Sequence, residues 1–223
     1  MKKVYVYCII ILISLAPFFR GLFFAMESYI FMAAFSILFI LYLLFKLRNS
    51  EPLFFSKWLL IPGGLLVFAH ALSSIRAVNM NEHTYTLMQY LVYFLAALVI
   101  CDYCCSENLK SFSSFMLPVA ISGLICAIVG LGLMTGAFPM FRYTLSNNRL
   151  GSTFQYPNTA AVYFIVCIVF VLTIINVSNN IIARSLLIGV GNILMFAFFM
   201  TGSRGGYLAG VITFLFVNLR VSY

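Results

Sequence analysis

The stretch Arg149-Leu-Gly-Ser-Thr-Phe-Gln-Tyr-Pro-Asn-Thr-Ala160 is polar and lies between long apolar runs. Pro157 lacks a backbone N–H and disfavours helix at the residue before it, and Gly151 permits unusual backbone angles. A loop is therefore predicted up to this point. Asn158 or Thr159 can then cap a helix that continues through the next apolar run.

The start of that helix has the composition of an anion site. Its first N–H groups have no intrahelical acceptor, and the helix dipole places a partial positive charge beside Arg149. An arginine in this position can bind a phosphate or a carboxylate with two parallel hydrogen bonds. The alternative is an ordinary connector whose arginine lies among lipid headgroups.

The composition of the whole chain is that of a membrane protein. The 223 residues are 64% hydrophobic and only 8% charged, which is outside the range of soluble globular domains. A helix needs about 20 apolar residues to cross ~30 Å of hydrocarbon. We identify eight candidate runs, of which the fourth and the last are short: Val4–Phe19, Tyr29–Phe45, Trp58–Ser74, Leu87–Ile100, Phe112–Met134, Thr159–Ile175, Ser185–Met200 and Gly205–Val217. The predicted fold is an all-α, polytopic transmembrane helical bundle that forms one integral membrane domain over residues 1–223.

The formal net charge of +8 does not indicate a nucleic-acid-binding protein, because the basic residues are scattered singly between the spans. With a cytoplasmic N-terminus, all five lysines fall on the inner side, as the positive-inside rule expects. The predicted inner set is Lys2, Lys3, Lys46, Arg48, Lys57, Lys110, Arg184 and Arg220. The predicted outer set is Arg20, Arg76, Arg142, Arg149 and Arg204. The outer set contains only arginine, the side chain suited to bidentate binding of phosphate.

The six cysteines do not predict a metal site. Three of them, Cys8, Cys126 and Cys167, lie in apolar runs and are expected to be small buried residues. The other three form a C-x-x-C-C cluster at residues 101–105, on the reducing inner side, without a second ligand pair at zinc spacing.

Two histidines lie toward the outer side. His70, near the outer end of the third run, is either a proton-handling group or, as we favour, a partner in an interhelical hydrogen bond. His83 lies in a predicted outer loop, Ile75–Tyr85, which is polar enough to help build a pocket.

A second special stretch, Thr201-Gly-Ser-Arg-Gly-Gly206, separates the last two runs. The predicted topology returns it to the same outer face as Arg149. An arginine at membrane depth costs ~3 kcal/mol or more unless it is paired or hydrated, so Arg204 is expected at the surface or in a polar cavity. Glycines recur every four residues from Gly202 to Gly210 and can form a small-residue face for close helix packing. The two roles are compatible.

Together, the two stretches resemble the O-antigen ligase and polymerase family. Arg149–Ala160 is similar to that family's segment with an arginine, a glycine and then proline-asparagine before a helix. Thr201–Gly206 is similar to its segment of threonine, a small residue and serine-arginine-glycine. The spacing also fits, with two spans and one inner loop between the stretches. The resemblance covers roughly Arg149–Gly210, and the first four spans add only generic similarity.

The resemblance implies a membrane glycosyltransferase of cell-surface polysaccharide biosynthesis. Such a protein moves a glycan from an undecaprenyl diphosphate carrier to a glycan or lipid acceptor on the outer side of the bacterial plasma membrane. Arginines there bind the diphosphate and stabilise it as it leaves, a role that falls to Arg149 and Arg204. The residues expected to shape the backbone around them are Gly151, Pro157, Asn158, Ser203 and Gly205. No metal or other cofactor is required, because the arginines supply the positive charge that a metal cation would otherwise supply.

The chain also departs from the pattern of that family. Its members are usually longer and carry, in a large outer loop, a histidine thought to activate the acceptor hydroxyl. This chain ends at Tyr223, before that loop would begin, and His70 and His83 do not match its position. The expectation is therefore the donor-binding part of such a protein: a truncated product, a fragment, or half of a split protein completed by a second polypeptide. No catalytic residue is assigned, and no activity of the chain alone is expected.

Two other classes of function stay open. The chain has no P-loop, G-x-S-x-G, H-E-x-x-H or paired-carboxylate motif that would indicate other chemistry. It can instead be a transporter whose outer arginines guide an anionic substrate, or a non-catalytic scaffold packed through its glycine faces. Interrupted helices would favour transport, and Pro62-Gly63-Gly64, predicted to loosen or kink the third helix, is the one good candidate.

Overall fold

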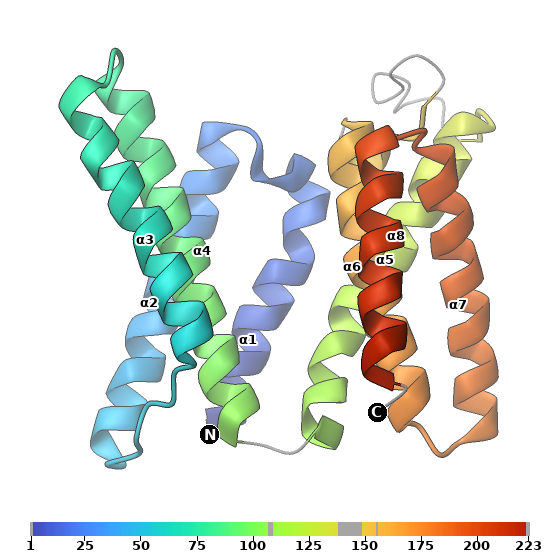
Figure 1. The fold of residues 1–223 in the computed structure, drawn as a ribbon, viewed down its shortest axis with the longest axis horizontal. Coiled ribbons are helices and arrows are strands. Elements are labelled where there is room, and N and C mark those ends of the chain that lie inside the picture. The colour runs from blue at the N-terminus through green and yellow to red at the C-terminus, as the bar shows by residue number, and fades with distance from the viewer. Residues whose placement is uncertain (1, 107–108, 138–148, 155, 222–223) are drawn as a thin grey trace. The chain divides into compact units, whose positions relative to one another are not determined.

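A computed structural model describes residues 2–106, 109–137, 149–154 and 156–221 of the chain. The regular elements in these residues are helices, so the all-α prediction is confirmed (Figure 1). The α-helices are α1 (Lys2–Leu15), α2 (Ala25–Arg48), α3 (Lys57–Ser73), α4 (Met80–Ser106), α5 (Leu109–Met134), α6 (Pro157–Val177), α7 (Ile181–Met200) and α8 (Arg204–Val221). The short 3-10 helices are η1 (Ala16–Leu22), η2 (Ser74–Arg76) and η4 (Ser152–Phe154).

Seven helical segments in the described part of the chain are long and apolar enough to cross a bilayer. They comprise α1 continued by η1, α2, α3 continued by η2, and α4 to α7. Helix α8 is not among them, and the side chains of its last residues lie outside the described part. The chain is a multi-pass membrane protein.

The fourth span was predicted too short. The apolar run covers Leu87–Ile100, whereas α4 extends over 27 residues from Met80 to Ser106. The predicted outer loop Ile75–Tyr85 is therefore largely helical. The side-chain oxygen of Asn79 accepts hydrogen bonds from the backbone N–H groups of Asn81 (3.2 Å) and Glu82 (3.4 Å), and so caps the first turn. A prediction based on hydropathy missed this turn, because the residues at the start of the helix are polar.

The third helix is not interrupted at Pro62-Gly63-Gly64, the stretch predicted to loosen or kink it. Helix α3 is continuous through Pro62, which lies in its second turn. Gly63 is needed for packing, because a Cβ atom there would lie 2.4 Å from a ring carbon of Phe94 on α4. The glycine therefore admits a neighbouring aromatic ring and does not interrupt the helix.

The chain groups into two compact units. Unit 1 comprises Met1–Ile13 and Leu22–Phe112, and unit 2 comprises Ser14–Gly21 and Ser113–Tyr223. In unit 1, α4 packs against both α2 and α3. In unit 2, α6 packs against α7 and α8, and the three helices lie side by side (Figure 1).

Helices in unit 2 approach one another closely at small residues. The glycine spacing predicted three such positions, and two of them contact a neighbouring helix. A Cβ atom at Gly206 would lie 2.7 Å from the Cβ of Ala161 on α6. One at Gly210 would lie 3.2 Å from the ring of Phe198 on α7. The third glycine of the repeat, Gly202, precedes α8 and packs against an arginine side chain instead of a helix.

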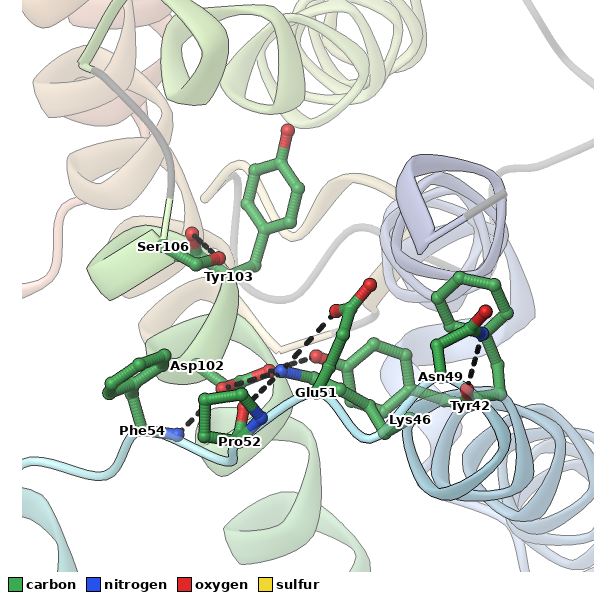
Figure 2. A network of polar contacts seen from close by, with 10 residues as sticks. Tyr42, Lys46, Asn49, Glu51, Pro52, Phe54, Asp102, Tyr103 and Ser106 are labelled. Atoms are coloured by element: carbon green, nitrogen blue, oxygen red, sulfur yellow. Dashed lines mark hydrogen bonds and ion pairs between the residues drawn. The ribbon is translucent and has the colours of Figure 1, made fainter.

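A buried ion pair joins α2 to α4 in unit 1 (Figure 2). Lys46 Nζ lies 2.9 Å from Asp102 Oδ2 and 3.2 Å from Oδ1, and both side chains are almost fully buried. The hydroxyl of Tyr42, also buried, donates to Asp102. Sequence analysis placed Lys46 among the inner basic residues but did not predict this pair, because its partners lie on separate helices.

The same ion pair holds the connection between α2 and α3. The backbone N–H of Phe54 donates to Asp102 Oδ1 (2.7 Å), and Lys46 Nζ donates to the carbonyl oxygen of Pro52 (2.6 Å). Glu51 lies 3.8 Å from the same ammonium group. Figure 2 shows these groups converging on the carboxylate and the ammonium. Each charge thus has several partners, which offsets the cost of removing it from water.

Candidate functional site

The stretch that begins at Arg149 is tied into unit 2 at several points. The backbone N–H of Leu150 donates to the carbonyl oxygen of Met200 at the end of α7 (3.0 Å). The hydroxyl of Ser152 donates to the carbonyl oxygen of Cys126 on α5 (2.5 Å). Gly130 on α5 makes room for this approach, since a Cβ atom there would lie 2.8 Å from the side chain of Leu150. The stretch is therefore fixed in place between helices.

The backbone angles of this stretch differ in one respect from the prediction. Gly151 was expected to adopt the unusual angles, but the positive φ falls on Ser152, at 52°. The hydrogen bond from the buried Ser152 hydroxyl to α5 accompanies this conformation, which costs a non-glycine residue ~1–2 kcal/mol.

Helix α6 begins at Pro157, two residues earlier than predicted, and its cap differs too. The N-cap residue is Tyr156, without a side-chain cap, and Pro157 occupies the first helical position, where its missing N–H costs nothing. Asn158, predicted as a possible cap, instead accepts a hydrogen bond from Arg149 Nη2 at 3.2 Å. The first intrahelical donor is the N–H of Ala160, so the amides of the preceding positions have no helical acceptor.

Helix α8 begins at Arg204, and the residue before it, Ser203, caps it. The hydroxyl of the buried Ser203 accepts from the N–H of Gly206 (3.0 Å), and the N–H of Tyr207 donates to the carbonyl oxygen of Ser203 (2.9 Å). Within the residues that the structure describes, the amides of Arg204 and Gly205 have no backbone or side-chain acceptor. They are available to an anion at the positive end of the helix.

Arg149 is held by both helix junctions. Its Nε donates to the carbonyl oxygen of Thr201 (2.9 Å), and its Nη2 donates to Asn158 (3.2 Å). The side chain lies against Gly202, whose φ is +58° and where a Cβ atom would lie 3.3 Å from Arg149 Nε. These contacts fix the guanidinium plane but leave several of its five N–H groups without a described acceptor.

A pocket of about 450 Å³ opens where these elements meet, lined by Arg149, Asn158, Gly202, Arg204 and Gly205. Two arginines and the first turns of two helices therefore face one space, with no acidic residue among the described residues of the lining. The Arg204 side chain is exposed and has no hydrogen-bond or ion-pair partner among the described residues. The combination of cationic side chains and free helix amides favours a small, highly charged anion.

The structure brings together four of the seven residues that sequence analysis selected for the site. Arg149, Arg204, Asn158 and Gly205 line the pocket. The other three, Gly151, Pro157 and Ser203, are buried and do not line the pocket; they belong to the loop and the two helix starts. Arg142, which was predicted on the same outer side, lies outside the described residues.

Sequence analysis missed two contributors. Gly202 was assigned to helix packing but lies beside Arg149, and the carbonyl of Thr201 orients the arginine. The signal for Gly202 was its position just before a capping serine, where a helix junction often needs a positive φ. The contact to the Thr201 carbonyl depends on the approach of segments 52 residues apart and had no local signal.

No set of three or more histidine, cysteine or acidic side chains in the described part of the chain could hold a metal ion. All six cysteines are free thiols.

Comparison of the chain with protein-family models, with curated protein sequences and with solved structures finds no match.

Replacing Gly202 with alanine is expected to lower stability by about 1–2 kcal/mol, because alanine disfavours a positive φ and its Cβ presses on Arg149. Displacement of the arginine should also weaken pyrophosphate binding. Gly189→Ala is the matched control, since Gly189 lies on α7, does not line the pocket, and a Cβ atom there meets nothing within 4 Å. Thermal unfolding in detergent and isothermal titration with pyrophosphate would compare the two variants. Equal behaviour of both would contradict the role given to Gly202.

Proposed function

We propose that this chain binds the diphosphate of a lipid-linked glycan in the pocket lined by Arg149 and Arg204. We further propose that it takes part in glycan transfer of the O-antigen ligase and polymerase type. The single observation that carries the proposal is that both arginines line one pocket at the starts of α6 and α8. The sequence resemblance points independently to the same two arginines.

The charge and shape of the pocket support a diphosphate over a single carboxylate. A diphosphate offers several oxygens and more negative charge than a carboxylate, so it can use two guanidinium groups and helix amides at once. Arg149 is oriented by Thr201 and Asn158, whereas Arg204 is exposed and able to adjust to the ligand. One arginine therefore serves as a fixed contact and the other as a mobile one.

The position of the pocket supports a ligand that is anchored in the membrane. It lies at the starts of α6, a candidate membrane span, and of α8, and a position at the end of a span is expected near the boundary between hydrocarbon and water. Counting the spans from a cytoplasmic N-terminus assigns this boundary to the extracytoplasmic side. The positive-inside rule supports that orientation, because it leaves all five lysines on the opposite side.

The chemistry that such a pocket can support is stabilisation of a leaving group. In glycan transfer, an acceptor hydroxyl attacks the anomeric carbon, the bond from that carbon to the diphosphate oxygen breaks, and the diphosphate takes the electron pair. Arg149 and Arg204 would stabilise the negative charge that develops on it. No residue of the chain is assigned as the base that accepts the hydroxyl proton.

The alternative of anion transport has lost its main support, because α3 runs unbroken through Pro62-Gly63-Gly64. Transport proteins typically bind their substrates where helices are interrupted near the middle of the membrane. The pocket of Arg149 and Arg204 lies at helix ends instead.

Native mass spectrometry of the purified chain with undecaprenyl diphosphate and undecaprenyl monophosphate would test the proposal. We expect the diphosphate to be retained roughly tenfold more strongly, since a further charge-assisted contact contributes ~1.5–3 kcal/mol. The doubly substituted Arg149→Gln/Arg204→Gln variant should lose this preference, and Arg184→Gln, at the start of α7, should keep it. Equal retention of both lipids by the unaltered chain would overturn the proposal.

A further inference from the structure

Two histidines come together in unit 1. His70 lies near the end of α3 and His83 in the first turn of α4, and their ring centres are 6.5 Å apart. The ring of His70 stacks on Tyr90 of α4, with centres 4.1 Å apart. The α3–α4 hairpin therefore brings two imidazoles to the same end of adjacent helices.

One of these imidazoles has an unused nitrogen. His83 Nε2 is buried and has no hydrogen-bond partner among the described residues. A buried polar atom normally finds a partner, and leaving it unpaired costs ~1–3 kcal/mol. An unpaired nitrogen beside a second imidazole calls for a ligand that both rings can bind.

We propose that His70 and His83 form a binding site for a divalent transition-metal ion of the nickel, copper and zinc class. Neutral imidazole nitrogen is a ligand that these ions prefer. With a nitrogen–metal distance of about 2.0–2.1 Å, two rings that share one ion have centres ~4.5 Å apart when the angle at the ion is about 90° and ~6.4 Å apart when it is about 180°. The observed separation of 6.5 Å matches the wide-angle limit, and an ion with a smaller angle requires side-chain rotations that bring the rings closer.

The chain supplies two ligands and water supplies the rest. Glu82 and Arg76, the charged side chains nearest in sequence, are both exposed. An open site of this kind binds an exchangeable ion, not a permanent structural one.

The effect of the ion is to add a link between two helices that already pack together. None of the residues of α3 is buried, so its side chains contribute little buried area to that packing. A metal ion that bridges His70 to His83 joins the end of α3 to the start of α4. Binding to the folded hairpin stabilises it by mass action.

The test uses the full chain, purified in detergent with an affinity tag that contains no histidine. The cysteines at positions 101, 104 and 105 are replaced by serine, so that thiols do not compete for the metal. Isothermal titration with NiCl₂ at about pH 7.5, where imidazole is mostly neutral, should give one ion per chain and a raised unfolding midpoint. His70→Phe, which keeps an aromatic ring on Tyr90, and His83→Gln should each weaken binding about tenfold or more.

Tyr90→Phe is the matched control, because it keeps the ring stack and removes no metal ligand. Electron paramagnetic resonance of the Cu²⁺-loaded, histidine-intact chain gives a second measurement that needs no histidine variant, and two imidazole nitrogens are expected in the copper spectrum. The proposal is overturned if Ni²⁺ binds equally well without either histidine. It is also overturned if the copper spectrum shows one nitrogen or none, or if the metal does not bind.

Discussion

Replacing Lys46 with methionine is expected to lower the stability of unit 1 by about 3–5 kcal/mol, more than any other single substitution proposed for this chain. Asp102 is fully buried, and the change leaves its carboxylate without a cation. The loss should appear as a lower unfolding midpoint in detergent and a lower denaturant midpoint in SDS titration. The loop between α2 and α3 should also become accessible to proteases, because Lys46 holds Pro52.

Three controls separate the buried charge from other effects. Lys57→Met removes an exposed lysine near Trp58 and should cost less than about 1 kcal/mol. Tyr42→Phe removes one hydrogen bond to the carboxylate and should cost about 1.5–3 kcal/mol. The double variant Lys46→Met/Asp102→Leu should recover much of the loss, because it removes both charges together. A Lys46→Met variant as stable as the unaltered chain would contradict the structural role of the pair.

Replacing Arg149 with lysine is expected to weaken pyrophosphate binding about 10- to 100-fold, although the net charge is unchanged. Lysine cannot donate simultaneously to Thr201 and Asn158 and still present a planar pair of N–H groups to the ligand. Arg204→Lys should have a smaller effect, roughly 3- to 10-fold, because no described contact orients the Arg204 side chain. Isothermal titration of the purified variants would give both ratios.

Arg184→Lys is the matched control for charge, since this exposed arginine lies in α7 near the opposite end of the helix from Thr201. It should bind pyrophosphate as the unaltered chain does. The same loss in all three variants would show that binding follows general surface charge and not the pocket. Unchanged binding in both Arg149→Lys and Arg204→Lys would remove the pocket as the anion site.

The positions of the helices could be predicted from the sequence, because an apolar run of sufficient length forms a helix in a bilayer and so satisfies its own backbone hydrogen bonds. Their ends could not be placed as well. The first turn of α4 contains Asn81, Glu82 and His83, which hydropathy alone assigns to a loop. The local signal for this turn is the capping residue Asn79, which hydropathy does not register.

Part of the candidate site could also be predicted, because it depends on local sequence and on counting spans. Both arginines were expected on one face, and they line one pocket. The details that orient Arg149 could not be predicted. They depend on a carbonyl oxygen of Thr201 and on a positive φ that fell on Ser152 and not on Gly151.

The ion pair of unit 1 could not be predicted from the sequence at all. Lys46 and Asp102 are 56 residues apart, and neither has an oppositely charged residue within four positions in the sequence. Such an acid and such a lysine near the ends of separate spans are compatible with exposure to headgroups. Only the packing of α2 against α4 pairs them.

Thiol labelling of Gly205→Cys in intact cells tests the central claim most directly, because Gly205 lines the pocket and its Cβ position is open. The six native cysteines are first replaced by alanine. Asn179→Cys, in the exposed connection between α6 and α7, serves as the control for the opposite side. We predict that a membrane-impermeant maleimide labels Gly205→Cys from outside, that pyrophosphate blocks this labelling, and that Asn179→Cys reacts only after the membrane is permeabilised. Labelling of Gly205→Cys only after permeabilisation, or labelling indifferent to pyrophosphate, would contradict an outward-facing anion pocket formed by Arg149 and Arg204.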